Sequence, residues 1–325
     1  MKPKLLITRK LPEKVLDRAE RGFAPVVRES TRPLSREEAV AALREHDAIL
    51  PTLGDPFDAE TFIRASPVTA RILANFGVGY DHIDAEAARR AGVVVTNTPG
   101  AVTDATADIA MTLLLMAARR AGEGERLVRS GAWEGWHPVQ LLGQHVTGKT
   151  LGIIGMGRIG RAVARRGHFG FGMDVVFFNR SMVADSGIPG ARQLESIGAV
   201  METADFVVVA VTGGRANRHL VGADEIARMK TTGVLVNISR GEVIDEAALI
   251  EALERRRIFA AGLDVYEHEP DVPLRLRRLE NVVLLPHLGT ATEEVREAMG
   301  MMALDNLEAF FAGRPVPNPV PEMQG

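Results

Sequence analysis

The stretch "TLGIIGMGRIG", residues 150–160, places three glycines directly after an apolar run. The apolar residues predict a buried strand, and the pattern that follows, "RIGRAVARRG", is typical of a helix. Glycines spaced G-x-G-x-x-G between a strand and a helix are typical of a dinucleotide-binding unit. Gly155 permits the tight turn, Gly157 lets backbone approach a pyrophosphate, and Gly160 lets the helix pack on the strand. We therefore predict a Rossmann-type cofactor site, with a ligand-free strand–helix turn as the alternative.

The start of the helix should hold the phosphates of this cofactor. A helix N-terminus offers free backbone N–H groups and the positive end of the helix dipole, and both attract anions. The residues expected to contact the pyrophosphate region are Gly155, Met156, Gly157, Arg158, Ile159 and Gly160.

The stretch "VFFNRS", residues 176–181, lies where such a unit usually carries an acid for the ribose of NAD, about 20 residues past the glycines. Asn179, Arg180 and Ser181 stand there instead. An acid would repel a 2′-phosphate, whereas an arginine can form a charge-assisted pair with it. We predict that NADP(H) is preferred and that NAD(H) is possible. The alternative is that Arg180 stacks on the adenine and discriminates little.

Composition narrows the classes of partner, site and location that this chain could have. The chain has 325 residues, 46% of them hydrophobic and 25% charged, with a net charge of −3. This length suits two domains, and the charge gives no reason to expect binding to nucleic acid or to an anionic membrane. There are no cysteines, which excludes disulfides and thiolate metal sites, and no metal site is expected. Apolar runs are too short for a membrane span or signal peptide, so we expect a cytoplasmic protein.

Short apolar runs alternate with helical patterns in two successive series, which predicts an α/β fold with mainly parallel sheets. A long helix is expected from residue 103 to about 130 and another from about 292 to 311, with loops at 131–138 and 274–279. The expected strands are residues 4–8, 25–27, 48–52, 71–76, 93–99, 151–154, 174–178, 206–211, 234–238, 260–264 and 282–285, and shorter helices are expected at 12–22, 35–46, 58–65 and 84–91.

Polar residues follow three strands of the second series. Arg240 comes after one strand, Asp264, Glu267 and Glu269 after the next, and His287 after the last. In parallel sheets, ligands gather at the carboxyl ends of strands. These segments are therefore expected to carry the chemistry.

Together with "NFGVGYDHID" (75–84), "NTPGAVTDATADIA" (97–110) and the glycine motif, these segments resemble the D-2-hydroxyacid dehydrogenase family from about residue 47 to 313. The resemblance implies two Rossmann-like domains with the active site in the cleft. The flavodoxin-like substrate domain would be discontinuous, residues 1–99 and 286–325, and the NAD(P)-binding domain would be residues 100–285. The implied reaction is the reduction of small 2-oxo acids of the glyoxylate or hydroxypyruvate type to 2-hydroxy acids.

The same resemblance implies a catalytic set of Arg240, Glu269 and His287. The guanidinium of Arg240 would bind the substrate carboxylate and polarise its carbonyl. His287 would donate a proton to the carbonyl oxygen as hydride reaches the carbon, and Glu269 would orient the imidazole. Glu267 is expected on the surface, and His219 is expected to be a surface or helix-start residue without a role.

The resemblance further implies that Asp264 and Thr106 meet the nicotinamide. Ile238, Ser239 and Gly289 are counted among the expected cofactor contacts. Backbone N–H groups of Val78 and Gly79 are expected at the substrate carboxylate, with Leu53 and Gly54 forming the opposite wall.

Other functions and partners remain open at this point. A 3-phosphoglycerate-dehydrogenase-like enzyme and a non-catalytic, corepressor-like nucleotide sensor are the alternatives. The long helix and the loop with Trp133 and Trp136 resemble the dimer arm of the family, so a homodimer is expected. The stretch "TGGRANRHL" (212–220) departs from the family's usual Thr-Pro turn, and Arg215 and Arg218 would be either solvated or near the rim of the cofactor site.

Overall fold

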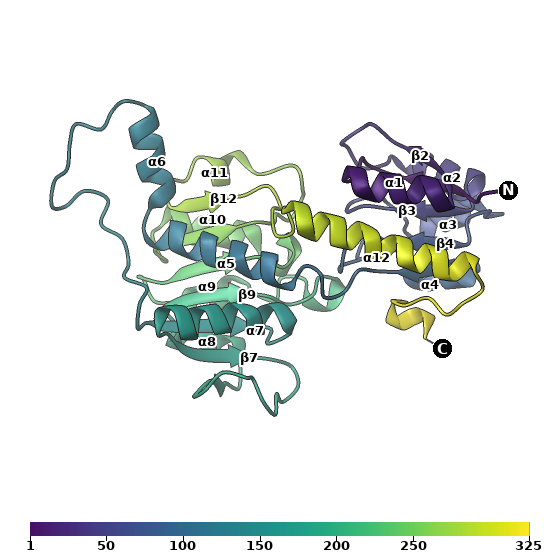
Figure 1. The fold of residues 1–325 in the computed structure, drawn as a ribbon. Helices are drawn as coiled ribbons and strands as arrows, with labels where there is room; N and C mark the ends of the chain where they lie inside the picture. Colours follow the sequence, from purple (N-terminus) through teal and green to yellow (C-terminus); the bar gives the residue numbers. More distant parts are fainter. Residues whose placement is uncertain (325) are drawn as a thin grey trace. The chain divides into compact units, whose positions relative to one another are not determined.

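The computed structural model describes residues 1–324, and Figure 1 shows its helices and strands. The chain forms two compact units, one made of Met1–Val102 with Ala291–Gly325 and the other of Thr103–Thr290. Within the described residues, no helix combines the length and apolar character that crossing a membrane requires.

Unit 1 is a parallel sheet with helices on both faces (Figure 1). Its strand order is β2-β1-β3-β4-β5, and every pair is parallel. Side chains alternate along each strand, so Leu6, Ile49 and Leu73 face a core shared with α2, α3 and α4, while α1 and α12 contact each other, and α12 also contacts β4. The elements are β1 (Lys4–Ile7), α1 (Glu13–Gly22), β2 (Ala24–Val27), α2 (Arg36–Glu45), β3 (Ala48–Leu50), α3 (Ala59–Ala65), β4 (Ile72–Ala74), α4 (Ala85–Arg90), β5 (Val94–Thr96) and α12 (Glu293–Phe311).

Unit 2 is a larger parallel sheet of order β12-β11-β10-β9-β6-β7-β8. Leu151 and Ile153 of β6 face a core shared with α5 and α7, whereas Ile154 faces the core beneath α8, α9 and α10. The elements are α5 (Thr103–Ala118), α6 (Ala121–Arg129), β6 (Thr150–Ile154), α7 (Arg158–Arg165), β7 (Asp174–Phe178), β8 (Arg192–Gln193), α8 (Ile197–Thr203), β9 (Phe206–Val209), α9 (Ala223–Arg228), β10 (Val234–Asn237), α10 (Glu246–Glu254), β11 (Ala260–Leu263), α11 (Leu274–Arg277) and β12 (Val282–Leu284).

Most predicted elements are confirmed to within a few residues, and local capping explains why several helices begin where they do. Ser35 accepts a hydrogen bond from the Glu38 N–H while the Glu38 carboxylate accepts one from the Ser35 N–H, which is the capping box expected from the sequence. Asp58 and Thr292 cap α3 and α12 in the simpler way.

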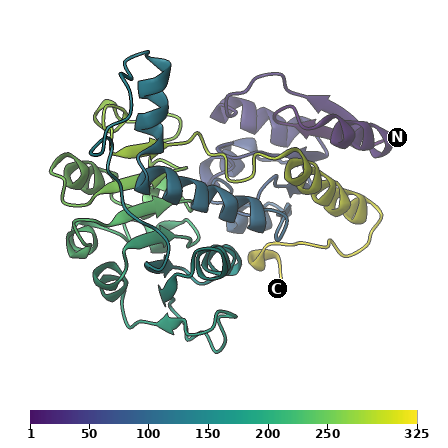
Figure 2. The ribbon, with the colours of Figure 1, turned by 60° about the vertical axis from the view of Figure 1, so that its left-hand side comes forward.

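The helix expected from residue 103 to about 130 is wrong as a single element. It is two helices, α5 and α6, and Figure 2 shows the change of direction between them. Arg120 has a left-handed backbone with φ 52°. The Ala118 carbonyl accepts a hydrogen bond from the Gln144 N–H, and the missing side chain of Gly143 makes this approach possible, because a Cβ there would lie 2.3 Å from the Ala118 oxygen. A contact from a later loop therefore ends α5.

Two smaller expectations also need correction. Residues 274–279, expected as a loop, include the short helix α11, whose Leu276 is buried while its arginines are exposed. Strand β8 is only two residues long and was not expected.

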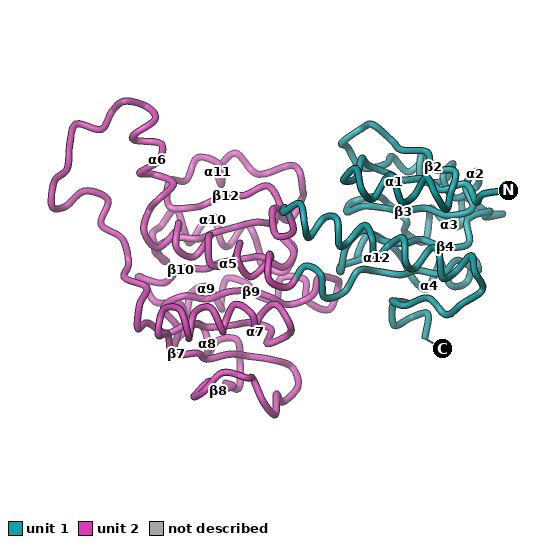
Figure 3. The backbone as a smooth tube through the Cα atoms, in the orientation of Figure 1, with its two compact units in different colours: residues 1–102, 291–325 teal, residues 103–290 magenta. Residues whose placement is uncertain are grey.

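The division between the units differs from the expected domain boundaries, 1–99 with 286–325 and 100–285, by a few residues (Figure 3). Residues 286–290 lie in unit 2 rather than with the C-terminal part. The Leu285 N–H donates to Leu263 and the His287 N–H donates to the Asp264 carbonyl, so this segment still belongs to the edge of the unit 2 sheet.

Candidate active site

The glycine turn of unit 2 connects β6 to α7. Gly155 has φ +98°, and a Cβ there would lie 2.8 Å from the Ala210 carbonyl oxygen. A Cβ on Gly160 would lie 2.1 Å from the carbonyl oxygen of Gly155 itself. The fold itself therefore requires glycine at these two positions.

Gly157 differs from its two neighbours in the motif. Its φ is −79°, which any residue adopts, and no heavy atom lies within 4 Å of the place where its Cβ would be. It stands at the N-cap of α7, where no side chain caps the free N–H groups. The fold does not explain this glycine, but a pyrophosphate does, because a ligand would occupy the space that a side chain would fill. The residues of the turn thus fit a dinucleotide.

The loop after β7 has a hydrogen-bonded structure of its own. The Asn179 amide donates to the carbonyl oxygen of Ser181 at 3.1 Å and to its Oγ at 3.2 Å. The amide expected to reach a phosphate is thus used within the loop. Arg180 is exposed, and within residues 1–324 it makes no hydrogen bond or ion pair.

The turn after β10 is built around Asn237, which the sequence analysis did not single out. Its Oδ1 accepts hydrogen bonds from the N–H of Ser239 at 3.0 Å and from its hydroxyl at 2.7 Å. Its Nδ2 donates to the carbonyl of Arg240 at 3.0 Å. Ile238 and Ser239 are both buried, so their side chains support the turn. Asn237 thereby fixes the backbone from which the Arg240 side chain extends.

Gly241 brings this turn against the segment that carries Glu269. A Cβ on Gly241 would lie 1.8 Å from the carbonyl carbon of Tyr266, so only glycine permits the contact. The Tyr266 hydroxyl donates to the Leu285 carbonyl at 2.8 Å, which links the ends of β11 and β12. Tyr266 thus connects segments carrying all three predicted catalytic residues.

His287 and Glu269 form a direct pair. His287 Nδ1 lies 2.9 Å from Glu269 Oε2, and the Tyr266 N–H donates to Glu269 Oε1 at 3.0 Å. Burial alone would raise the pKa of Glu269. The hydrogen bond and charge of His287, the Tyr266 N–H and the charge of Arg240 together hold that pKa below its usual value. Glu269 is therefore ionised at neutral pH, and both it and His287 keep part of their side chains accessible.

The turn after His287 is held by the buried carboxylate of Asp264. Oδ1 accepts from the Leu288 N–H at 2.6 Å, and Oδ2 accepts from the Gly289 N–H at 2.8 Å. Burial raises the pKa of Asp264 even though these hydrogen bonds and the charge of His287 act in the opposite direction. Thr106 donates from Oγ1 to the Gly289 carbonyl at 3.0 Å. Asp264 and Thr106, expected at the nicotinamide, and Gly289, expected as a cofactor contact, thus form one hydrogen-bonded corner.

Glu267 and His219, expected as surface residues, are in contact with each other. The Glu267 side chain is only 10% exposed, and its Oε1 lies 2.7 Å from Arg218 Nη2 and 2.9 Å from His219 Nε2. Arg218 is therefore paired with Glu267, although its side chain remains 52% exposed. Glu242 Oε1 accepts a hydrogen bond from the Gly214 N–H at 2.7 Å, which adds a third contact to the loop that carries Arg218 and His219.

The expected substrate loop lies in unit 1, where Asn75 and Asn97 shape it. The Asn75 amide donates to the carbonyls of Gly77 and Gly79, and the Asn97 amide donates to that of Val78. Within residues 1–324, the N–H groups of Val78 and Gly79 make no hydrogen bond. The carbonyls are thus held within the loop, while these two donors have no partner within the described residues.

Leu53 and Gly54 also lie in unit 1, on the turn after β3. The Leu53 carbonyl accepts from Arg9 Nη1 at 2.9 Å, and Gly54 has φ +88°. Asp55, just beyond, is fully buried and accepts from the Thr52 and Leu34 N–H groups. This turn is therefore fixed by buried polar contacts.

Residues 111–289 match the family model of the D-isomer specific 2-hydroxyacid dehydrogenase, NAD binding domain. The chain belongs to this family. It is an NAD(P)-dependent D-2-hydroxyacid dehydrogenase, as the sequence predicted.

Relatives of this dehydrogenase include glyoxylate reductases of archaea. That of Thermococcus gammatolerans is 43% identical over 321 residues, which cover 98% of this chain and 95% of the relative. That of Korarchaeum cryptofilum is 43% identical over 320 residues, covering 98% and 96%. The dehydrogenase is thus glyoxylate reductase-like.

Solved structures confirm the predicted two-domain α/β fold. The NADPH-dependent glyoxylate/hydroxypyruvate reductase of Sinorhizobium meliloti, in complex with NADP and malonate, has a TM-score of 0.87 and 36% identity and covers 99% of this chain and 98% of its own. A glyoxylate reductase from Paecilomyes thermophila has a TM-score of 0.85 and 33% identity, covering 99% of each chain.

The contrast among the glycines gives a test of the cofactor site. Gly157→Ala should change the free energy of unfolding by less than about 1 kcal/mol, the range for an N-cap glycine. It should weaken NADPH binding at least about tenfold, which corresponds to roughly 1.4 kcal/mol. Gly160→Ala should instead cost about 1–3 kcal/mol or more in stability, because the new Cβ meets backbone. Thermal unfolding and fluorescence titration with NADPH measure both quantities. Equal destabilisation by the two changes would contradict the assignment.

Proposed function

We propose that this dehydrogenase reduces small 2-oxo acids such as glyoxylate and hydroxypyruvate, and that it prefers NADPH. The observation that carries the proposal is the His287–Glu269 hydrogen bond at the carboxyl ends of β11 and β12, with Arg240 at the end of the neighbouring strand β10. The glyoxylate reductase relatives support the choice of substrate.

The pairing of Nδ1 with Glu269 assigns a task to each nitrogen of His287. Because Glu269 is ionised, it accepts a hydrogen bond from Nδ1–H, and Nε2 is the nitrogen left for the substrate. In the direction of reduction, Nε2 donates its proton to the carbonyl oxygen and the hydroxyl forms. In the reverse direction, Nε2 accepts that proton.

The bound nicotinamide supplies the hydride that reaches the carbonyl carbon. Arg240 binds the substrate and attracts the negative charge that develops on its oxygen, since its planar guanidinium can bind two oxygen atoms at once. We propose that the free N–H groups of Val78 and Gly79 bind the substrate carboxylate and that Leu53 and Gly54 line the substrate site.

Asp264 and Thr106, the residues expected at the nicotinamide, belong to the hydrogen-bonded corner that they form with Gly289. The hydrogen of the Thr106 hydroxyl is used by Gly289, so Thr106 can meet the nicotinamide only as an acceptor. Both Asp264 oxygens already accept from backbone N–H groups, so Asp264 would contact the cofactor with a remaining lone pair.

The loop after β7 supports the proposed preference for NADPH. Arg180 is an unpaired exposed cation there, and Asn179 and Ser181 carry no charge that would repel a 2′-phosphate. The Sinorhizobium meliloti reductase, which is NADPH-dependent, supports the same choice.

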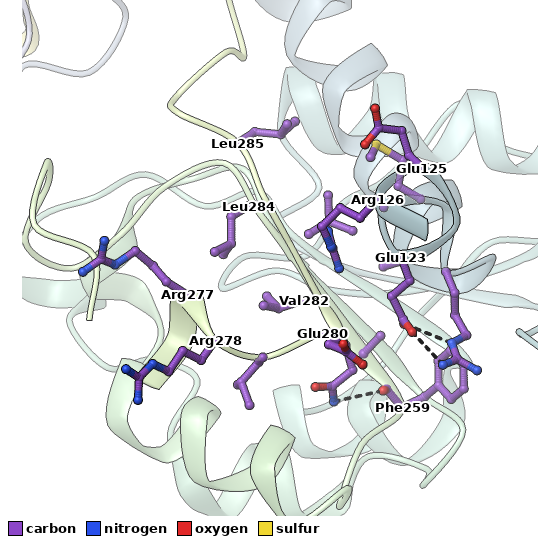
Figure 4. Close-up of a pocket in the computed structure, with 18 of the residues that line it drawn as sticks. Glu123, Glu125, Arg126, Phe259, Arg277, Arg278, Glu280, Val282, Leu284 and Leu285 are labelled. Carbon is purple, nitrogen blue, oxygen red and sulfur yellow. Dashed lines mark hydrogen bonds and ion pairs between the residues drawn. The ribbon is translucent and has the colours of Figure 1, made fainter. Parts of the chain in front are cut away.

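We also propose that the protein is a homodimer formed through α6 and the loop that follows it. Helix α6 buries none of its residues, and Val128, Trp133, Trp136, Val139 and Leu142 are between 51% and 79% exposed. Beside α6 lies an open pocket of about 770 Å³, lined by the apolar edge strand β12 and by charged residues such as Arg126 and Glu123 (Figure 4). A surface segment that exposes several large apolar side chains typically marks a protein interface.

The proposed reaction can be tested by turnover. Purified protein with NADPH should reduce glyoxylate and hydroxypyruvate, and His287→Ala should lower kcat by about 10²–10⁴-fold, the range for loss of a general acid. His145→Ala, the same substitution at an exposed histidine whose side chain makes no hydrogen bond or ion pair within residues 1–324, is the control and should keep the wild-type rate. Nicotinamide absorbance measures both. Wild-type turnover no higher than that of His287→Ala would rule out the proposed reaction and favour a nucleotide sensor.

The proposed choice of cofactor can be tested at Arg180. Arg180→Asp should raise KM for NADPH by at least about tenfold, because a charge-assisted hydrogen bond worth roughly 1.5–3 kcal/mol is replaced by repulsion. KM for NADH should change much less. Steady-state kinetics with both cofactors measures the ratio, and equal losses would show that this loop does not choose the cofactor.

The proposed homodimer can be tested by the mass of the protein in solution. Light scattering at micromolar concentration should give twice the chain mass of 35.2 kDa. Trp133→Ser with Trp136→Ser should shift the protein towards the monomer. Ile63→Ser, which removes an equally exposed apolar side chain from unit 1, should not. A wild-type monomer would refute the proposed dimer.

A further inference from the structure

One side chain holds the first part of the loop after β7, residues 179–183. Gln193, the second residue of β8, donates from Nε2 to the carbonyl oxygens of Asn179 at 3.1 Å and Ser181 at 3.0 Å. Its Oε1 accepts from the Val183 N–H at 2.9 Å. The three hydrogen bonds span residues 179–183, the first part of the loop between β7 and β8.

The partners fix the orientation of this amide. Carbonyl oxygens can only accept and the Val183 N–H can only donate, so Nε2 must face the two carbonyls and Oε1 must face Val183. Strand β8 is the edge strand of the sheet, and its two residues pair with Val176 and Phe177 of β7. This short strand therefore places Gln193 beside the loop that follows its partner strand.

Gln193 also determines which way the loop's N–H groups point. In a trans peptide the N–H points opposite to the C=O, and the peptide bonds after Asn179 and Ser181 are trans. Their carbonyls point at Gln193, so the N–H groups of Arg180 and Met182 point away from it. Within residues 1–324, neither N–H makes a hydrogen bond.

The surface turned away from Gln193 thus presents hydrogen-bond donors of the backbone. It offers two backbone N–H groups, and the same loop carries the exposed, unpaired guanidinium of Arg180, while the two carbonyls that would repel a phosphate are held on the opposite side. A loop already ordered in this way loses less entropy when it binds an anion.

We propose that Gln193 is a positioning residue for cofactor choice, because it holds residues 179–183 in the one conformation that presents these donors to the 2′-phosphate of NADPH. This inference rests on the proposed preference for NADPH. It assigns to Gln193 no contact with the cofactor itself.

The test uses the full-length protein and two nucleotides that differ only in the 2′-phosphate, 2′,5′-ADP and 5′-AMP. Gln193→Met removes the amide without adding charge. It should weaken binding of 2′,5′-ADP by about tenfold, the effect of one or two lost hydrogen bonds. Binding of 5′-AMP should change by less than about twofold, and the same split should appear in KM for NADPH against NADH with kcat unchanged. Gln144→Met, the same substitution at a loop glutamine whose side chain makes no hydrogen bond within residues 1–324, is the matched control and should change neither.

The outcomes separate this inference from the proposed preference. If the wild type binds both nucleotides equally, the preference for NADPH fails and the role of Gln193 fails with it. If the wild type prefers 2′,5′-ADP but Gln193→Met weakens both nucleotides equally, or neither, only the role of Gln193 is overturned. Gln193→Asn, whose amide is one methylene too short to reach all three partners, gives the same readout should the methionine variant not fold.

Discussion

The hydrogen bonds from Leu288 and Gly289 to the buried carboxylate of Asp264 are the constraint on which the pairing of His287 with Glu269 depends. They close a turn directly after His287, whose φ of +56° is unusual for a residue with a side chain. A backbone conformation of this kind persists only where its surroundings hold it. The orientation of the imidazole towards Glu269 is thus a consequence of a carboxylate that lies more than 20 residues earlier in the chain.

Glycines serve this protein in two distinct ways. Gly155, Gly160 and Gly241 are required by neighbouring backbone, which would collide with any side chain. Gly157 meets nothing, so its lack of a side chain has meaning only when a ligand is present. A sequence motif treats these positions alike, and only the surroundings of each Cβ separate the needs of the fold from those of binding.

The sequence was sufficient for all strands but the short β8, for most helices and for the polar residues that follow the strands, because these follow from local periodicity and from the direction of parallel strands. It failed where a distant segment decides the local structure. The end of α5 depends on Gly143, and the burial of Glu267 depends on Arg218 and His219, about 50 residues earlier. Gln193 lacked any signal, because its partners are backbone groups and a pattern of residue types does not show them.

The two passages of the chain between the units have a consequence for biosynthesis. Strands β1–β5 leave the ribosome first, but α12, which packs on β4 and buries Leu304 and Leu307, follows only after the whole of unit 2. At ordinary translation rates the delay is about 10–40 s. During that time one apolar face of the first sheet lacks its covering helix, so the nascent chain should be a client for chaperones that bind exposed apolar surface, although the finished protein is not.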